Sequence, residues 1–440
     1  MNIFYGTTYL LTYLLIAYSL WTRKPMWAIV VFAAFLFCHF VIEGHKWQLV
    51  PLYLIAVLLL VVLLWQAAPQ WFIISVLLIT FLALFLSRGL HTIFPNFTFP
   101  EPTGDHKVGV TDVTMENGER AKIWYPAMER DDNRIYPYLA SFDRPIFNLP
   151  IFIFSHLKGR DTFSFQDAVP SNRGPFPVII YEHSADGFRE ENTFLLTDLV
   201  SHGYIAIAVK HRNTLADYEL DLAALSTRPE DFMAAMTDVV MRDRLAELQQ
   251  VVNGLPTLNQ PNGYLHGKLL LDQINFLGYS LGGGIVTDYC AANPACRSVV
   301  NLDGNPFGIA HKVGLKAPYL HISQNVVLEM TKASGPSSTV AQMTELYKRD
   351  VGQIIAQTRE NGFGAHWLLL HNSGHASFTD FSYWIAVRWG MLKSLFGTVE
   401  TETSHQTIRL VVRKFIDQPS SFDSSQLRDH QLLSAFPEIP

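Results

Sequence analysis

The sequence predicts an α/β domain, built on a mostly parallel eight-stranded sheet flanked by helices, that follows an all-α domain of four transmembrane helices. Two observations lead to this prediction. The first 87 residues contain only four charged side chains, which are Arg23, Lys24, Glu43 and Lys46. Later in the chain, short apolar runs rich in β-branched residues alternate with longer helix-like stretches, the order in which helical crossovers connect parallel strands.

Four apolar stretches make up most of the N-terminal region, and none of them contains a charged residue. A helix needs about 20 apolar residues to span a bilayer core, with about 17 as the lower limit, and each stretch meets that limit, some with their flanks. The predicted transmembrane helices are residues 3–21, 26–42, 49–65 and 71–87. A buried helical bundle is disfavoured because no polar face is available for water, and a cleaved signal peptide would need a basic start. The transmembrane domain thus covers residues 1–90, and a linker covers residues 91–105.

The few charges of this region set the expected orientation. Arg23 and Lys24 lie in the first connection between helices, whereas Lys46 in the second is offset by Glu43. Because basic residues favour the cytoplasmic side, we expect the first and third connections there. This places both termini and the large second domain on the non-cytoplasmic side of a multi-pass membrane protein, whose partner is the lipid bilayer.

Composition limits the other functions open to the chain. The net charge of −6 and the lack of a basic stripe argue against nucleic-acid binding. Three cysteines are too few for a disulfide framework. Cys290 and Cys296 are close enough in sequence to form a bridge, but two free thiols fit equally well. The redox compartment and the oligomeric state therefore stay open.

The second domain is expected at residues 106–400, with residues 401–440 as a C-terminal helix and polar tail. Its first two strands form a hairpin that can extend the sheet with an antiparallel edge. The centres of the later strands are almost continuously apolar, as in a sheet covered on both faces. The predicted strands are residues 108–114, 121–125, 178–182, 204–209, 273–278, 298–302, 318–322 and 366–371. The predicted helices are residues 191–202, 229–253, 281–293, 338–360 and 380–396.

A serine between glycines lies where a strand gives way to a helix. Gly278, Ser280 and Gly282 fit the pattern Gly-x-Ser-x-Gly, after an apolar strand and before an apolar helix. The pattern favours a sharp, strained turn in which the glycines leave room for neighbouring elements. Such a turn lifts the hydroxyl above the carboxyl edge of the sheet and aims the N–H of Leu281 at an oxyanion. We therefore predict Ser280 as a catalytic nucleophile.

The partners of this serine are expected on the loops that follow. A serine hydroxyl needs a base to become nucleophilic, and with this motif the partners come in the order serine, acid, histidine. Asp303 ends the next strand at the same sheet edge and is the predicted acid. Asp288, inside the helix behind the serine, is a weaker candidate. His375 follows the last parallel strand and is the predicted base.

The loop at residues 181–191, after the third strand, is expected to supply a second oxyanion donor because its small residues let the backbone approach a substrate. We predict the N–H of Ala185, beside that of Leu281. Neighbouring side chains are expected to contact the substrate: His183, Ser184, Tyr279, Phe307 and Phe378. No metal-binding motif and no phosphate-binding glycine loop is found, so neither a metal nor another cofactor is expected.

Six stretches together resemble one family. "IWYPA" (123–127), "VIIYEHSADGFRE" (178–190), "DLVSHGYIAIAVKHR" (198–212), "GYSLGGG", "NLDGNPF" and "HASFTDF" (375–381) resemble, in order, motifs of the plasma and type II platelet-activating factor acetylhydrolases. The resemblance covers about residues 105–397. It implies an α/β-hydrolase fold, the triad Ser280, Asp303 and His375, and oxyanion donors at Ala185 and Leu281. It also implies metal-independent hydrolysis of short or oxidised acyl chains of phospholipids, or of simpler esters.

The chain departs from the family pattern in three places. The oxyanion loop reads His-Ser-Ala-Asp where the family tends to have His-Gly-x-Gly. The negative charge of Asp186 would be unfavourable beside a developing oxyanion unless its side chain turns away or pairs, and Arg189 is the nearest candidate partner. A helical insertion at about residues 327–362 separates the acid from the histidine. The N-terminal membrane region is an addition to the usual pattern.

The sequence therefore predicts a membrane-anchored serine ester hydrolase acting on an ester or phospholipid substrate through an acyl-enzyme. Alternatives with the same triad are a polyester or cutinase-like esterase, a thioesterase and an acyltransferase. A further alternative is a non-catalytic membrane scaffold with a hydrolase-like ectodomain. The aromatic segment at residues 136–165 is interpreted either as part of an acyl pocket or membrane contact, or as core packing of an inserted hairpin or helix.

Overall fold

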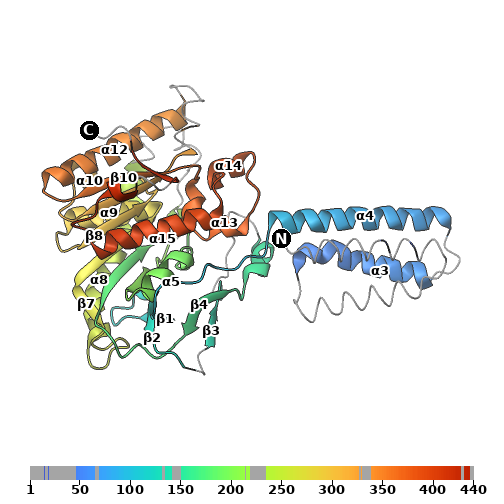
Figure 1. Cartoon of the computed structure of the whole chain (residues 1–440), viewed down its shortest axis with the longest axis horizontal. Helices are drawn as coiled ribbons and strands as arrows, with labels where there is room; N and C mark the ends of the chain where they lie inside the picture. Colours follow the sequence, from blue (N-terminus) through green and yellow to red (C-terminus); the bar gives the residue numbers. More distant parts are fainter. Residues whose placement is uncertain are drawn as a thin grey trace. The chain divides into compact units, whose positions relative to one another are not determined.

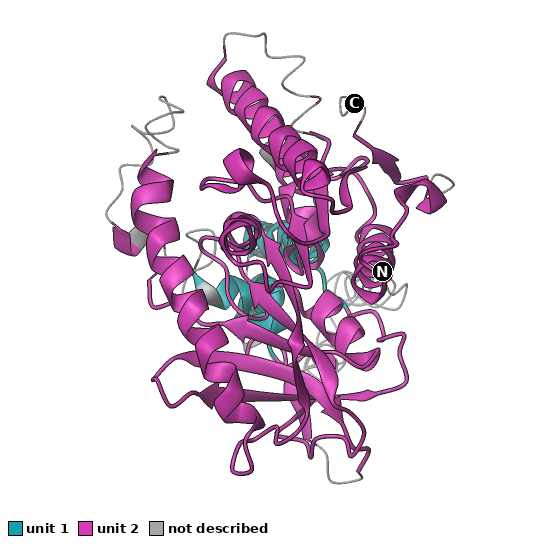
Figure 2. Ribbon diagram, turned by 90° about the vertical axis from the view of Figure 1, so that its left-hand side faces the viewer, with its two compact units in different colours: residues 1–97, 141–158, 384–387 teal, residues 98–140, 159–383, 388–440 magenta. Residues whose placement is uncertain are grey.

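The computed structural model describes residues 14, 18, 46–64, 69–130, 134–140, 150–213, 215–218, 234–326, 329, 338–427 and 431–436. The chain divides into two compact units, coloured separately in Figure 2. The first comprises residues 1–97, 141–158 and 384–387, and the second comprises residues 98–140, 159–383 and 388–440. The predicted helices at residues 3–21 and 26–42 lie outside the described residues, apart from Leu14 and Tyr18.

The described part of the first unit is helical. It contains η1 (Trp47–Leu49), α3 (Val50–Leu64), α4 (Gln70–Ile93) and η2 (Ile151–Leu157), drawn in Figure 1. The indole of Trp47 lies 5.3 Å from the ring of Phe94 and donates a hydrogen bond of 3.3 Å to His156. Phe154 packs at 5.2 Å against Trp384. The helix η2 thus belongs to the same aromatic cluster as the segments before and after the two apolar helices.

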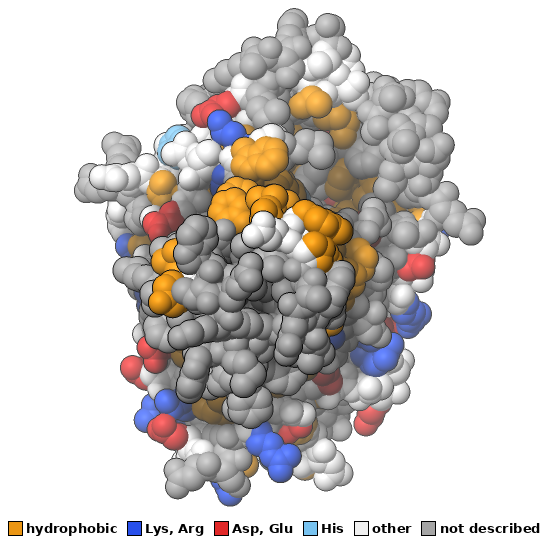
Figure 3. Space-filling view, turned by 90° about the vertical axis from the view of Figure 1, so that its right-hand side faces the viewer, with side chains coloured by type: hydrophobic (Ala, Val, Ile, Leu, Met, Phe, Trp, Pro, Cys, Tyr) orange, Lys and Arg blue, Asp and Glu red, His pale blue; other side chains and the backbone are white. Residues whose placement is uncertain are grey.

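Among the described residues, one helix is long and apolar enough to cross a membrane. This helix is α4, whose 24 residues give a length of about 36 Å. The helix α3 comprises 15 described residues and borders residues 65–68, which the structure does not describe. Large apolar side chains are exposed on both helices, among them Leu54, Trp71 and Phe85. Figure 3, seen from the right-hand side of Figure 1, shows described apolar side chains gathered together.

The second unit is built on one sheet of eleven strands. Their order is β11-β10-β9-β8-β7-β5-β6-β2-β1-β4-β3. The strands are β1 (Lys107–Thr114), β2 (Arg120–Ala127), β3 (Arg134–Pro137), β4 (Asp161–Gln166), β5 (Phe176–Glu182), β6 (Ile205–Val209), β7 (Leu269–Tyr279), β8 (Ser298–Leu302), β9 (Tyr319–Gln324), β10 (Ala365–Leu370) and β11 (Leu433–Ala435). Each of the eight predicted strands is therefore present.

The centre of the sheet, from β10 to β6, is parallel throughout. The hairpin of β1 and β2 joins it in antiparallel fashion through β2 and β6. The prediction of eight strands with this hairpin at the edge was wrong, because β3 and β4 continue the sheet beyond β1 and β11 pairs with β10. These extra strands are three to six residues long, too short for a clear alternation in the sequence.

Helices cover both faces of the sheet, as the apolar strand centres predict. The helices α8, α9 and α12 bury Leu248, Ile285 and Ile354 in one continuous core. On the opposite face, α5 packs against α15, since the crossover from β5 to β6 runs in the reverse direction along the sheet. The helices of this unit are α5 (Thr193–Ser201), η3 (Leu215–Tyr218), the π-helical turn η4 (Met236–Met241), α8 (Arg242–Asn259), α9 (Leu281–Ala292), α10 (Ala310–Val313), α12 (Thr339–Glu360), η5 (His375–Phe378), α13 (Phe381–Trp384), α14 (Met391–Phe396), α15 (Thr401–Asp417) and η6 (Ser424–Leu427).

Several predicted boundaries differ from the structure. The helix predicted at residues 380–396 is two short helices, α13 and α14, because Gly390 adopts a φ of 56° between them. The aromatic segment at residues 136–165 includes β3, η2 and β4, which fits the hairpin interpretation better than a single element. The C-terminal region contains the expected helix, α15, and after it β11 pairs with β10 in the sheet of the second unit.

The end of the predicted linker is fixed to the second unit. Thr103 donates hydrogen bonds of 2.8 Å from both its N–H and its hydroxyl to Asp198 on α5. Arg409 on α15 pairs with the same carboxylate and donates a bond of 2.8 Å to the carbonyl of Glu101. Burial alone would raise the pKa of Asp198, but these partners hold it below its ordinary value. The residues before β1 are therefore an ordered part of the second unit.

Candidate active site

The turn between β7 and α9 has the strained geometry that its glycines predict. Ser280 adopts a φ of 55° and a ψ of −124°, a left-handed conformation that ordinary residues rarely occupy. A Cβ atom on Gly278 would lie 2.2 Å from the carbonyl oxygen of Gly282, and one on Gly282 would lie 2.2 Å from that of Glu182. Both glycines are therefore required for the strand, the turn and the helix to approach so closely.

The three predicted triad residues come together at the carboxyl edge of the sheet. His375 Nε2 lies 2.9 Å from Ser280 Oγ, and His375 Nδ1 lies 2.6 Å from Asp303 Oδ2. The other oxygen of Asp303 accepts the backbone N–H of Gln324 at 3.0 Å. The Asp303 side chain is only 6 % exposed, whereas that of His375 is 35 % exposed. A buried carboxylate thus orients an imidazole whose other side reaches the hydroxyl.

The alternative acid, Asp288, has another role. Its carboxylate accepts the N–H groups of Gly308 and Ala310, both at 2.8 Å, where α10 begins. Burial raises the pKa of Asp288 to about 6, although these bonds act in the opposite direction. The geometry therefore favours Asp303 over Asp288 as the partner of the histidine.

The residues 183–187, which we call the oxyanion loop, lie against the start of α9. A Cβ atom on Gly282 would also approach the carbonyl oxygen of His183 to 2.7 Å, so this loop and the N–H groups that open α9 are neighbours. Leu281 is the first residue of α9, where backbone N–H groups have no partner within the helix. Within the described chain, the N–H of Ala185 donates no hydrogen bond. Both predicted donors are therefore available to a ligand.

Arg189, the candidate partner of Asp186 in the sequence, is engaged with another carboxylate. Arg189 reaches Asp112 on β1 instead, a residue 77 positions earlier in the chain. The side chain of Asp186 is exposed to solvent at the tip of the loop.

The predicted substrate contacts have mixed outcomes. Phe378 is fully buried in the turn that follows His375, and Ser184 is bound to Glu191, so neither side chain is presented as predicted. Tyr279 is also buried, and its hydroxyl donates a bond of 3.0 Å to the carbonyl of His375, which positions the base. Phe307 is partly buried against the core.

His183 is held by the loop and by a second histidine. Its Nδ1 lies 2.7 Å from the carbonyl oxygen of Ser184, and its ring lies 5.0 Å from that of His211. Only 6 % of its surface is exposed. The predicted role of His183 in substrate contact therefore stays a prediction.

A buried charged cluster beneath the oxyanion loop was not found from the sequence. His211 lies between two carboxylates, 2.5 Å from Glu182 and 2.6 Å from Glu247. Burial alone would lower the pKa of His211, but these carboxylates raise it above its ordinary value. Arg244, fully buried on the same face of α8 as Glu247, completes the cluster. The one feature of the sequence that could have indicated this cluster is Glu182, a charged residue at the end of an apolar strand.

Cys290 and Cys296 form a disulfide that links the end of α9 to the segment before β8. The sequence left this open. Because such bonds persist in oxidising compartments, the bridge bears on where the second unit is located.

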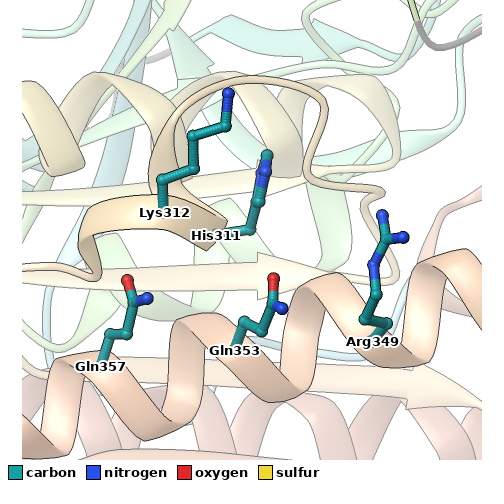
Figure 4. Close-up of a pocket in the computed structure, with 5 residues that line it drawn as sticks. All are labelled: His311, Lys312, Arg349, Gln353 and Gln357. Carbon is teal, nitrogen blue, oxygen red and sulfur yellow. The ribbon is translucent and has the colours of Figure 1, made fainter.

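A polar hollow lies apart from the predicted site residues, none of which lines it. It has a volume of about 440 Å³. Figure 4 shows Gln353 and Gln357 pointing from α12 toward α10, which carries His311 and Lys312. Arg349 on α12 is the remaining lining residue and pairs with Asp350.

Comparison with known proteins places the chain in a family. The sequence pattern of the family described as platelet-activating factor acetylhydrolase, isoform II, matches residues 91–423. The chain belongs to this family. The platelet-activating factor acetylhydrolase of Bos taurus is 22 % identical, over 76 % of this chain and 82 % of the bovine protein. That of Cavia porcellus is also 22 % identical, over 77 % of this chain and 82 % of its own length.

A solved structure agrees with this family at the level of the fold. The ferulic acid esterase of Streptomyces cinnamoneus covers 78 % of this chain and 100 % of its own, with a TM-score of 0.56 and 20 % identity. The predicted α/β-hydrolase-like fold, with its mostly parallel sheet flanked by helices, is confirmed. The prediction that the chain is an enzyme of the ester-hydrolase class is confirmed by its family.

Proposed function

We propose that the chain is a membrane-anchored serine carboxylic ester hydrolase that works through an acyl-enzyme. The observation that carries the proposal is the hydrogen-bonded chain from Asp303 through His375 to Ser280, with the serine in a strained turn. A structural ion pair between Asp303 and His375 would not require a serine with strained backbone angles as the next hydrogen-bonding partner. This combination is the arrangement that serine hydrolases use to activate a hydroxyl.

In the proposed mechanism, Ser280 Oγ attacks the ester carbonyl while His375 Nε2 accepts its proton. Asp303 holds the imidazole with Nδ1–H toward the carboxylate and stabilises the cation. The N–H groups of Ala185 and Leu281 bind the tetrahedral oxyanion, each contributing roughly 3–4 kcal/mol. The imidazolium then protonates the departing alcohol, and water, activated by the same histidine, releases the acid.

We propose acyl esters of phospholipids as the substrate class. The support is the family itself, whose members compared above are named for platelet-activating factor. A hydrolase that acts on such amphiphilic molecules benefits from a location at the bilayer.

The membrane part of the proposal keeps the four-helix prediction, with the second unit on the non-cytoplasmic side. The helix α4 supports a membrane span by length and composition. The disulfide between Cys290 and Cys296 supports an oxidising location for the second unit. A C-terminal reporter that becomes active only in the cytoplasm tests this topology, and a cytoplasmic signal would overturn it.

The catalytic proposal is tested on the full-length chain in detergent micelles. We expect a fluorophosphonate probe to label Ser280, and we expect p-nitrophenyl esters to be hydrolysed fastest when the acyl chain is short. Ser280→Ala should abolish both the labelling and the hydrolysis. Unchanged hydrolysis by Ser280→Ala would refute the proposal. Product analysis with an added alcohol separates hydrolysis from acyl transfer.

A further inference from the structure

An arginine that lies outside the triad is buried directly beneath the oxyanion loop. Arg244 occupies the first turn of α8 and has no exposed surface. Burial lowers the pKa of its guanidinium, but the carboxylates of Glu182, Glu191 and Glu247 favour the charged form. A buried guanidinium stays protonated, so these carboxylates provide the compensating charge that a buried cation requires.

The hydrogen bonds of Arg244 are unusual for a buried arginine. Its Nη1 donates to the carbonyl oxygens of His183 and Ser184, both at 3.2 Å, and its Nη2 donates to that of Ala185 at 2.6 Å. Within the described chain, none of its hydrogen bonds goes to a carboxylate. The guanidinium therefore binds three consecutive peptide groups of one loop rather than a single acidic partner.

These bonds contribute to where the N–H groups of the loop point. The carbonyl of Ser184 also lies 2.7 Å from His183 Nδ1 and accepts the N–H of Gly187 at 3.2 Å. In a trans peptide, the carbonyl and the N–H of the next residue point in opposite directions. The carbonyl of Ser184 faces Arg244, so the N–H of Ala185 faces the opposite side of the loop. That N–H donates to no other group in the described chain, and the loop borders the start of α9 through Gly282.

A second group fixes the preceding peptide. Glu191 accepts the N–H of Ser184 at 2.6 Å and its hydroxyl at 2.7 Å. The peptide between His183 and Ser184 is thus held on both sides, by Arg244 at its carbonyl and by Glu191 at its N–H. Gly187 makes this approach possible, because a Cβ atom there would lie 2.0 Å from the Glu191 carboxylate. The next peptide is held only at its carbonyl, which leaves one N–H for a ligand.

We propose that Arg244 is a positioning residue for the oxyanion hole, which aims the Ala185 N–H at the substrate oxygen by binding the carbonyls of residues 183–185. This inference rests on the proposed function of Ser280. It accounts for the geometry of a loop that has Ser184 and Asp186 where the family tends to have glycines. A side chain from α8 thus holds the backbone of this loop in place.

The test compares Arg244→Met and Arg244→Lys with wild type in detergent micelles, using a short-chain p-nitrophenyl ester. Fluorophosphonate labelling, run to completion, counts the active sites so that kcat is expressed per functional serine. We expect kcat per labelled site to fall by about tenfold or more, because one oxyanion donor is misplaced. The affinity for a trifluoromethyl ketone, whose adduct places an oxyanion in the hole, should fall by a similar factor. KM should change much less.

Arg409→Met is the matched control. Arg409 is also buried and also binds a backbone carbonyl, that of Glu101, but it pairs with Asp198 away from the oxyanion loop. Its loss should lower the melting temperature and leave kcat per labelled site and the ketone affinity unchanged. If Arg244→Met does not fold, Arg244→Lys carries the test, since it keeps the buried charge but loses the fork that reaches three carbonyls.

Two outcomes are distinguishable. A fall in kcat of less than about tenfold in the folded Arg244 variants, or an unchanged ketone affinity, overturns the positioning role. In that case Ser280 is still labelled and the proposed function stands. Absence of labelling in wild type would instead overturn the proposed function itself.

Discussion

Replacement of Gly282 by alanine should damage catalysis through a movement of the oxyanion loop. Gly282 is the second residue of α9, and the added Cβ atom would stand 2.2 Å from the carbonyl oxygen of Glu182 and 2.7 Å from that of His183. Contacts of a Cβ atom below 3.0 Å essentially never occur. Both neighbours are backbone atoms, so no side chain can rotate away to relieve the contact.

The size of the effect follows from these distances. Relief of the closest contact requires a displacement of about 1 Å between the loop and the helix. Ala185 lies on one side of this contact and Leu281 on the other, so the two donors would separate. Because a misplacement of about 1 Å can reduce a rate by about 100-fold, we expect kcat/KM of Gly282→Ala to fall by about two orders of magnitude.

The assay is hydrolysis of p-nitrophenyl acetate, normalised to the sites labelled by a fluorophosphonate. Gly352→Ala is the matched control, because Gly352 lies in α12 with no heavy atom within 4 Å of the added Cβ. The control should keep full activity and gain roughly 0.5–1 kcal/mol of stability. A kcat/KM for Gly282→Ala close to that of the control would refute the reasoning.

Three further predictions concern the acid, a buried histidine and the disulfide. Asp303→Asn should lower kcat by about 10³ to 10⁴ at an unchanged melting temperature, because the imidazole loses both its orientation and its counter-charge. Burial lowers the pKa of His405 to about 3, so its contribution to stability is complete above the ordinary histidine pKa of about 6.5 and is lost as the pH falls below it. The stability difference between wild type and His405→Gln should therefore shift against wild type by about 1.4 kcal/mol per pH unit between pH 6.5 and 4, measured by denaturant unfolding. Replacing both Cys290 and Cys296 by alanine should cost about 2 kcal/mol of stability and leave kcat unchanged.

Each of these has a clear contrary result. Full activity in Asp303→Asn would mean that the carboxylate has no part in catalysis. A pH-independent difference for His405→Gln would mean that the histidine is protonated in the folded chain. A loss of kcat in the cysteine variant would mean that the bridge supports the serine turn.

The sequence predicts those parts of the site that local chemistry determines. Gly278, Ser280 and Gly282 lie within five residues, and one turn geometry explains all three. Asp303 and His375 follow from the order of loops along one sheet edge, once strands and helices are recognised to alternate. Their assignment required no knowledge of contacts between distant residues.

Other parts of the site depend on distant partners and leave no pattern in the sequence. Arg244 binds carbonyl oxygens some sixty residues earlier in the chain, and every residue type has a carbonyl. Arg189 was the candidate partner for its neighbour Asp186, but the sheet brings Asp112 on β1 into contact with it. The short strand β11 was missed because three residues carry too little periodicity to recognise.

The strand β11 covers one edge of the sheet with residues that lie far after the catalytic histidine in the sequence. It pairs with β10 over Leu433, Ser434 and Ala435, and Phe436 then stacks on Trp367 at 3.7 Å. Without these residues, β10 would present a row of unpaired backbone groups, which is a template for joining another chain. Premature termination shortly before Leu433 would thus produce proteins that carry the whole catalytic apparatus and yet tend to aggregate.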